Sequence, residues 1–343
     1  MHVSVVGLGV IGGSIAKRLK RDGFLVSGYD SDEFHSSRAL AQGVVDHLVD
    51  LVSADSEMVF VAVPASSAAQ IVKAALEVVD CPVTDVSSVK SAICREVDSP
   101  LFVPGHPMAG SEKSRLEGAS ASLFEHAPWV LTPTAATDEG ALHRVADVVA
   151  SFGADVRFLS PDRHDDLMAA VSHAPHLLAA TLVNSAFAVP EDREWIANLA
   201  GGGFRDMTRV ASGDSGIWLD ICMANSLAIQ SRLRDLSARL SSIADALGAG
   251  DSKVLKEILE IELRNASRSR SLIPERKART MHLKVEGSEE SIGKVQEICE
   301  RLGVKIEESF ERAGSVNIMV SQSVGQAVLG ALVARGLDVS EVD

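Results

Sequence analysis

The segment from Gly7 to Gly12, GLGVIG, constrains the fold more than any other part of this sequence. It follows a short apolar stretch, Val3–Val6, and precedes a stretch of helical character from Ser14 to Lys20. At a strand-to-helix turn, glycines with this G-x-G-x-x-G spacing allow a tight turn, the close approach of a pyrophosphate and close packing of helix on strand. The segment therefore predicts a dinucleotide-binding turn, with the N-terminus of the following helix directed at the phosphates.

The acidic residue Asp30 indicates which dinucleotide binds. A second apolar stretch, Leu25–Tyr29, ends at Asp30, about 20 residues after the glycines, where an acid holds the ribose 2′-hydroxyl. A carboxylate repels the 2′-phosphate of NADP, and the next lysine or arginine along the chain is Arg38. NAD is therefore the predicted cofactor, unless Arg38 turns toward the ribose. The alternative is a glycine-rich turn of an α/β protein that binds no nucleotide.

Composition excludes several classes of protein. A chain of 343 residues, 46% of them hydrophobic, predicts a globular protein of two or three domains. The net charge of −14 argues against a nucleic-acid or anionic membrane surface, and no apolar run reaches the ~18 residues of a membrane span. The four cysteines lack C-x-x-C spacing, and no signal-like segment precedes the first strand, so free thiols and a cytoplasmic location are expected.

The pattern of elements changes near Asp162. Before it, strands and helices alternate, which predicts one parallel, doubly wound sheet. The later strands of that sheet are expected at Met58–Val63, Val83–Val86, Leu101–Val103, Trp129–Leu131 and Val156–Leu159. After it, three long helices are expected, at His164–Ala188 with an interruption near Pro175, at Ser215–Leu247 and at Ser252–Leu263. Their broad apolar faces predict a helical domain that packs against a second copy in a homodimer.

The C-terminal part forms a separate unit. A basic stretch, residues 264–279, reads as a solvated linker, and the elements after Thr280 follow the order βαββαβ of a ferredoxin-like unit. Since no catalytic cluster stands out there, a regulatory or assembly role is expected. The predicted domains are 1–161, 162–272 and 279–343.

Two residues near strand ends are candidates for catalysis. His106 lies between Gly105 and Pro107 after a predicted strand, so we expect a rigid turn that presents a general base at the carboxyl edge of the sheet. A turn histidine bonded to the backbone is the alternative. Ser88, after the strand Val83–Val86, would orient an imidazole or the nicotinamide ribose, or would simply cap a helix.

The segment Ser172–His176 contains two histidines, His173 and His176, with His164 and its acidic neighbours Asp165 and Asp166 not far upstream. Such a cluster of histidines and carboxylates is one alternative for a metal site. Because Pro175 distorts the i, i+3 geometry and no cysteine assists, polar ligand contacts or hydrogen-bonded core histidines are favoured, and no metal is predicted.

Two arginines follow a run of three glycines, residues 201–203. Arg205 and Arg209 are spaced i, i+4, which brings like charges together on one helix face and is unfavourable without a counter-charge. An anion held between them would relieve this repulsion, since arginine suits bidentate carboxylate recognition. A surface pair neutralised by Asp206 is the alternative.

Together these segments resemble the prephenate/arogenate dehydrogenase family of tyrosine biosynthesis. The matching segments are Gly7–Gly12, Asp85–Lys90, His106–Glu112, Ser172–His176 and Gly201–Arg209 with the later Trp218, in the family's order over most of residues 1–270. The resemblance implies an α/β Rossmann domain followed by an all-α dimerisation domain. The tail resembles the small α+β ferredoxin-like (ACT-like) domain that senses an amino-acid effector in some members, although it lacks an obvious ACT ligand-loop signature.

The resemblance also implies roles for individual residues. His106 would be the catalytic base, and Ser88 would hold His106 and the nicotinamide. Substrate contacts are expected from Arg209, Ser172 and His176, from Arg205 and Glu112 at the entrance, and from Trp218, which reaches across the dimer interface. The cofactor contacts are expected from Gly7, Leu8, Gly9, Val10, Ile11, Gly12, Asp30, Val63, Pro64 and Ser88.

The activity that these resemblances imply is NAD-dependent oxidative decarboxylation of prephenate, which requires a base, a positioned NAD and cations for the carboxylates. Arogenate is the alternative substrate, and the expected pairing of His176 with a pyruvyl carboxylate favours prephenate. A β-hydroxyacid dehydrogenase would use a lysine in its helical domain, and no lysine occurs from Asp162 to Gly250. In a non-catalytic NAD-responsive sensor, His106 and Arg209 would have no role.

Overall fold

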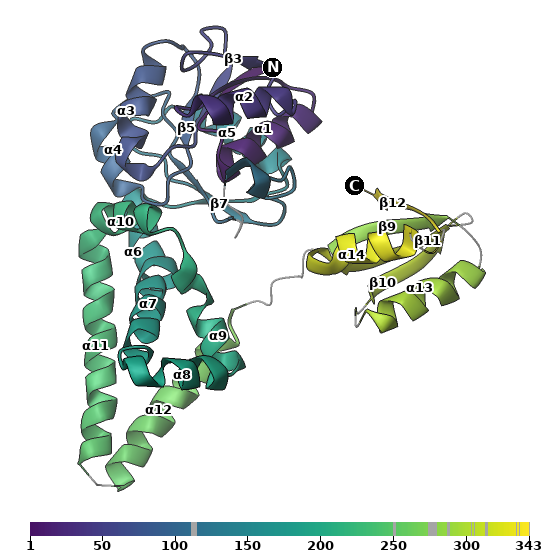
Figure 1. The fold of residues 1–343 in the computed structure, drawn as a ribbon. Coiled ribbons are helices and arrows are strands. Elements are labelled where there is room, and N and C mark those ends of the chain that lie inside the picture. Colours follow the sequence, from purple (N-terminus) through teal and green to yellow (C-terminus); the bar gives the residue numbers. More distant parts are fainter. Residues whose placement is uncertain are drawn as a thin grey trace. The chain divides into compact units, whose positions relative to one another are not determined.

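The computed structural model describes residues 1–110, 115–249, 252–273, 280–286, 289–302, 304, 306–312, 315–333, 335 and 337–342. The chain divides into two compact units, Met1–Asp245 and Ala246–Asp343, which Figure 1 colours along the sequence. Within the described ranges, no helix combines the length and apolar character that a membrane span requires. The domain boundaries expected from the sequence stay predictions.

The first unit begins with a five-stranded parallel sheet in the order β3-β2-β1-β4-β5. The strands are β1 (His2–Val6), β2 (Leu25–Tyr29), β3 (His47–Leu48), β4 (Met58–Val61) and β5 (Val83–Asp85). The central strands are nearly continuous in apolar residues because helices cover both of their faces. Strands β1 and β4 lie where the strand order reverses, which is where ligands bind in open α/β sheets.

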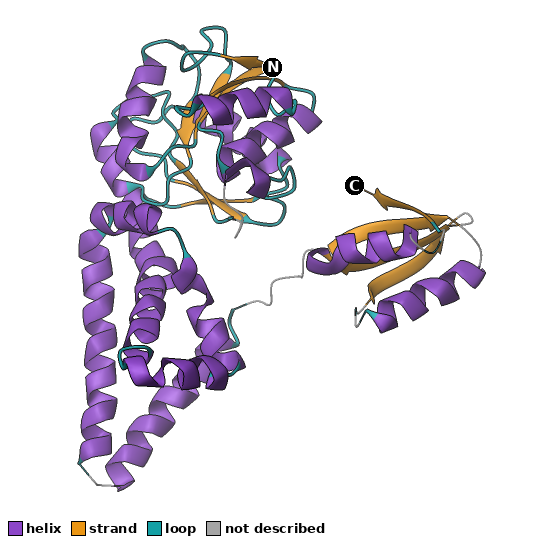
Figure 2. Ribbon diagram, viewed as in Figure 1, coloured by secondary structure: helices purple, strands orange, loops and turns teal. Residues whose placement is uncertain are grey.

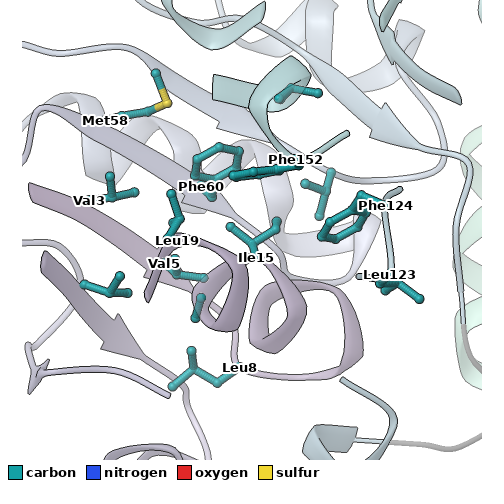
Figure 3. Close-up of a cluster of buried hydrophobic side chains, with 14 of the residues drawn as sticks. Val3, Val5, Leu8, Ile15, Leu19, Met58, Phe60, Leu123, Phe124 and Phe152 are labelled. Carbon is teal, nitrogen blue, oxygen red and sulfur yellow. The ribbon is translucent and has the colours of Figure 1, made fainter. Parts of the chain in front are cut away.

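Helices cover both faces of this sheet (Figure 1). Helices α1 (Val10–Arg21), α2 (Glu33–Ala41) and α5 (Glu139–Ser151) contribute to one buried cluster, and α3 (Ala65–Leu76) and α4 (Ser91–Glu96) to the other. Figure 3 shows the first cluster, in which Ile15 and Leu19 of α1 lie over Val3 and Val5 of β1. Its aromatic side is a group of four fully buried rings, Phe60, Phe124, Trp129 and Phe152.

The prediction of a single sheet before Asp162 is wrong, because the strands there form two sheets, and the second has three strands. Strands β6 (Gly105–Pro107), β7 (Pro128–Leu131) and β8 (Asp155–Phe158) form it, with β6 antiparallel and β8 parallel to β7. The predicted strand Leu101–Val103 is wrong, since only one bridge, Val83–Phe102, is formed there. Pro100 and Pro104 flank this segment and lack the N–H groups that a longer ladder needs. A short 3₁₀ turn, Arg115–Gly118, precedes β7.

The rest of the first unit is helical (Figure 2). It comprises α6 (Pro161–Met168), α7 (Ala174–Ala186), α8 (Arg193–Leu199), α9 (Gly202–Thr208), α10 (Ser215–Ala224) and α11 (Ser226–Gly248), with 3₁₀ turns at Pro190–Asp192 and Arg209–Ser212. The interruption expected near Pro175 is a π-helical segment, Ala169–His173, because Pro175 lacks an N–H for the regular ladder. The prediction of a single helix over Ser215–Leu247 is wrong, since the helix is interrupted at Asn225, between α10 and α11.

The second unit contains α12 (Ser252–Arg270) and a four-stranded antiparallel sheet. Its elements after α12 are β9 (Thr280–Glu286), α13 (Glu289–Arg301), β10 (Ile306–Arg312), β11 (Ser315–Ser321), α14 (Gln322–Val333) and β12 (Asp338–Val342), so the order is βαββαβ. The spatial order β10-β11-β9-β12 is that of a ferredoxin-like unit. The basic linker was misplaced in part, because Arg264, Arg268 and Arg270 lie within α12, whereas residues 274–279 are outside the described ranges.

The Phe152 ring lies among Phe60, Phe124 and Trp129, and we expect Phe152→Ala to lower the free energy of unfolding by roughly 3–5 kcal/mol. Urea denaturation of the two proteins measures the difference. The control is Phe158→Ala, since Phe158 is 55% exposed and its loss should change stability by under about 0.5 kcal/mol. Similar losses in both variants would contradict this account of the core.

Candidate active site

The glycine turn has the geometry that a bound pyrophosphate needs. Gly7 has a φ of +88°, and a Cβ on it would lie 2.3 Å from the carbonyl oxygen of Ala62. A Cβ on Gly12 would lie 1.8 Å from the carbonyl oxygen of Gly7, so α1 packs against the turn only with glycine there. Gly9, by contrast, has no atom of the described residues within 4 Å of its Cβ position, and it lies at the N-cap of α1. The backbone at Gly9 is therefore open to a phosphate.

Asp30 lies where β2 ends, beside the glycine turn. Its carboxylate accepts hydrogen bonds from the N–H of Leu8 at 2.7 Å and from the N–H of Asp32 at 3.0 Å. The side chain is 15% exposed, so it has a surface left for a ribose. Arg38, the candidate for a 2′-phosphate contact, is instead paired with Glu117. These residues fit NAD.

The loop after β5 is held by a buried ion pair. The Lys90 ammonium lies 2.5 Å from Asp85 and donates to the hydroxyl of Ser87 at 3.0 Å and to the carbonyl of Gly105 at 2.7 Å. Both charged side chains are fully buried. Ser88 is half-buried within this loop, and the cap of α4 is Lys90, so the alternative of Ser88 as a helix cap is wrong.

His106 lies within β6, paired with Val130, and not in the turn predicted from its glycine and proline neighbours. Its side chain is buried, and its Nδ1 lies 2.9 Å from Nε2 of His164. Burial lowers the pKa of His106 well below 6.5, and His164, Lys90 and His173 lower the pKa further by electrostatic repulsion. His106 is therefore neutral at pH 7, as a general base must be before it takes a proton.

His164 joins His106 to a carboxylate. Its Nδ1 lies 2.8 Å from Oδ1 of Asp165, and that oxygen also accepts from the N–H of Lys90 at 2.8 Å. The other oxygen, Oδ2, accepts from the N–H of Ser91 at 2.8 Å. Burial raises the pKa of Asp165, but the hydrogen bonds from His164 and from the two N–H groups outweigh burial and leave the pKa below its usual value.

Asn225 connects this group to His173 of the π-helical segment. Its side-chain amide donates to the carbonyl of Asp165 at 2.9 Å and lies 3.1 Å from Nδ1 of His173. Burial lowers the pKa of His173 to about 4. The break between α10 and α11 thus places a buried amide where a continuous helix would not.

His176 and Trp218 form the adjoining side of the site. Their rings stack with centroids 3.5 Å apart, and Nδ1 of His176 is buried without a hydrogen-bond partner among the residues that the structure describes. Gly213 makes this close approach feasible, since a Cβ there would lie 2.7 Å from Nε1 of Trp218. Burial also lowers the pKa of His176. Ser172 is half-buried in the π-helical segment next to His173.

The remaining predicted residues come from other elements. Arg205 is on α9 and Arg209 begins the following 3₁₀ turn, and both elements pack against α7, which carries His176. Both arginines are exposed, and Arg205 donates to the carbonyl of Ala200 at 3.0 Å. Val63 and Pro64 follow β4 beside Gly7. Glu112 lies outside the described residues.

The fold and the site define a class of proteins in which a Rossmann-type nucleotide-binding domain with a histidine at its edge is followed by a helical domain. Residues 15–158 match the family model for the prephenate dehydrogenase nucleotide-binding domain, and residues 160–261 match the model for the prephenate dehydrogenase dimerization domain. The chain belongs to the prephenate dehydrogenase family, which confirms the resemblance seen in the sequence.

Similar proteins agree with this assignment. Prephenate dehydrogenase of Lactococcus lactis is 32% identical over 272 residues, which cover 75% of this chain and 74% of that protein. The crystal structure of prephenate dehydrogenase from A. aeolicus with hydroxyphenyl propionate and NAD⁺ has a TM-score of 0.70 at 30% identity, and the match covers 78% of this chain and 98% of that one. Arogenate dehydrogenase of Synechocystis has a TM-score of 0.67 at 28% identity, and the match covers 79% of this chain and all of that one.

Sequence reasoning missed Asn225, and it named Asp85, Lys90 and Asp165 only as parts of segments, without a role for their side chains. His164 was noted only in connection with a metal, and no group of three or more metal-binding side chains is present among the residues that the structure describes. One signal was available. His164, Asp165 and Met168 share the buried face of α6, and polar residues on an apolar face of a helix indicate buried hydrogen bonds.

Because His173 is neutral in the folded protein and its pKa is about 4, the unfolded state binds more protons between about pH 6.5 and pH 4. We expect the free energy of unfolding to fall by about 1 kcal/mol for each pH unit in this window from His173 alone. Urea denaturation at several pH values should show a shallower fall in His173→Gln. His143→Gln is the control, since His143 is exposed, and an unchanged slope in His173→Gln would contradict the assignment.

Proposed function

We propose that this chain is an NAD-dependent prephenate dehydrogenase that catalyses oxidative decarboxylation of prephenate to 4-hydroxyphenylpyruvate. The observation that carries the proposal is the neutral, buried His106, held by His164 and adjoining the loop that contains Ser88, in a chain of this family. Relatives named prephenate dehydrogenase and a similar structure with NAD⁺ bound support the activity and the cofactor.

The residues supply proton transfer and positioning. Bound NAD would accept a hydride from ring C4 of the substrate. Nε2 of His106 takes the proton of the C4 hydroxyl, so that a ketone forms at C4. The ring carboxylate then leaves as CO₂, its bonding electrons make the ring aromatic, and the phenolate oxygen recovers the proton from His106. The base is therefore regenerated within one turnover, and aromatisation makes the step effectively irreversible.

The substrate is a dianion, and the proposed contacts match its charges. Arg209 pairs with a carboxylate of the substrate, and Arg205 and Glu112 are the proposed charged residues at the entrance of the substrate site. Nδ1 of His176 is buried and lacks a partner within the described part of the chain, which suits a hydrogen bond to the pyruvyl carboxylate, with Ser172 close by. Trp218 holds the His176 ring by stacking, and Ser88 orients His106 and the nicotinamide.

The helical domain is proposed to form a homodimer. Large apolar side chains are exposed on α8, α9, α10 and α11, where Leu199 is 75%, Met223 78% and Leu227 83% exposed. Apolar residues in such number on one part of a monomer indicate a protein interface. A second copy of the chain is the proposed partner, in agreement with the match to a dimerization domain.

The ferredoxin-like unit from β9 to β12 is proposed to be an ACT-like regulatory domain. Its βαββαβ order and its separate core, which includes Leu283, Ile298 and Leu332, support a unit that folds around its own sheet. An amino-acid effector is the proposed ligand.

The test of the function is NADH formation from prephenate and from arogenate, each with NAD and with NADP. We expect turnover with prephenate and NAD, and His106→Asn should lower kcat by about 10²- to 10⁴-fold while NAD binding survives. Turnover with arogenate alone would favour arogenate as the substrate. The similarity to an arogenate dehydrogenase structure is the reason to include it in the test. No turnover with any pair would overturn the proposal and favour an NAD-responsive sensor.

Arg209→Ala removes the proposed carboxylate partner and should raise KM for prephenate at least tenfold with a smaller effect on kcat, because the pairing is made in the ground state as well. Steady-state kinetics with saturating NAD measure both constants. Arg157→Ala is the control, since Arg157 is exposed on β8 and pairs with Asp155. An unaltered KM would remove Arg209 from the substrate site.

A further inference from the structure

Three side chains form a continuous hydrogen-bonded series from α6 to β6. The imidazoles of His106 and His164 meet edge to face with centroids 5.1 Å apart, and Nδ1 of His106 lies 2.9 Å from Nε2 of His164. Nδ1 of His164 lies 2.8 Å from the Asp165 carboxylate. His164 is fully buried and the Asp165 side chain is 6% exposed, so water does not compete for these hydrogen bonds.

The positions of the protons follow from the carboxylate end of the series. Ionised Asp165 accepts hydrogen bonds and donates none, so Nδ1 of His164 carries a proton and donates it. In a neutral imidazole the other nitrogen is then an acceptor, so Nε2 of His164 accepts from Nδ1–H of His106. This leaves Nε2 of His106 with a lone pair, which is the protonation state that a general base requires.

We propose that His164 and Asp165 are positioning residues that select this tautomer of His106 and stabilise the imidazolium that forms when His106 takes a proton. The proposal rests on the proposed function only where it assigns to His106 the removal of a proton from the substrate. The tautomer of His106 itself does not depend on a substrate. Neither residue touches the substrate in this scheme. The proton that His106 takes is returned to the product oxygen, and Asp165 stays ionised throughout.

The surroundings of His106 explain why such support is needed. Burial, His164, Lys90 and His173 all lower the pKa of His106, so its cationic form is costly. Lys90 is already paired with Asp85 across the loop after β5, so the Asp85 charge is neutralised. Asp165 is the carboxylate that reaches His106 through a hydrogen-bonded neighbour, and it balances the charge on the imidazolium.

Asp165 is fixed in place by hydrogen bonds within the protein. The N–H groups of Lys90 and Ser91 each donate to one of its carboxylate oxygens, and Asn225 donates to its backbone carbonyl. A carboxylate held by the N–H groups of Lys90 and Ser91 does not need to reorganise as charge develops on His106, which is the condition for effective electrostatic stabilisation.

The decisive measurement is the tautomer of His106, read from the ¹⁵N shifts of its ring in the full-length, histidine-labelled protein and assigned by comparison with His106→Asn. In the native protein we expect a protonated Nδ1 and an unprotonated Nε2. His164→Leu removes the acceptor and should mix the tautomers, whereas His164→Gln keeps an acceptor at the place of Nε2 and should retain the native one.

Kinetics provide the second readout. We expect His164→Leu and Asp165→Asn to lower kcat roughly 10- to 100-fold with KM for NAD unchanged, and His164→Gln to recover most of the loss. Asp166→Asn is the matched control, since Asp166 is the next residue of α6 and is exposed. Thermal unfolding of each variant shows which of them remain folded at the assay temperature.

Two results would overturn the proposal. One is a native His106 tautomer in both His164→Leu and Asp165→Asn. The other is an equal loss of kcat in His164→Gln and His164→Leu, which indicates that the position only fills space. Because the ¹⁵N measurement needs no substrate, it decides the proposal even if the native protein turns over neither prephenate nor arogenate.

Discussion

The carboxylate of Asp165 joins the helical part of the first unit to its nucleotide-binding part. It lies on α6 and accepts hydrogen bonds from the N–H groups of Lys90 and Ser91, which are 75 and 74 residues away in sequence. It also accepts a hydrogen bond from the ring of its neighbour His164. These bonds hold the start of α4, the loop after β5 and the base His106 in one arrangement. An uncompensated buried carboxylate would be strongly destabilising, so folding must form all of these hydrogen bonds together.

The buried pair of Asp85 and Lys90 adds a second constraint on the same region. Its energetic value as an ion pair is modest, because desolvation of two charges offsets most of their attraction. Its geometry matters more. The Lys90 ammonium also binds the carbonyl of Gly105, the residue before His106, and thereby ties the five-stranded sheet to the strand that carries the base. The pair thus specifies the position of β6, because a hydrogen bond is directional and a hydrophobic contact is not.

Local patterns predicted the elements around the site better than the site itself. The spacing of Gly7, Gly9 and Gly12 is decisive because backbone sterics at those positions admit only glycine or require open space. His106 was predicted to be a general base in a turn, whereas it lies in strand β6, since a glycine and a proline on either side favour turns when no partner strand is considered. The break at Asn225 was missed because its reason is a hydrogen bond to the carbonyl of Asp165, 60 residues away.

The sequence by itself determined the glycine turn, the acid at the end of β2, the change from alternating elements to helices near Asp162 and the βαββαβ order of the C-terminal unit. Each depends on local sterics or on the period of apolar residues, which a linear pattern contains. Tertiary structure alone decided that the first strands divide into two sheets and that His106, His164 and Asp165 form one hydrogen-bonded series. Such contacts join residues far apart in the chain, and their energy comes from excluding water around polar groups that no local pattern brings together.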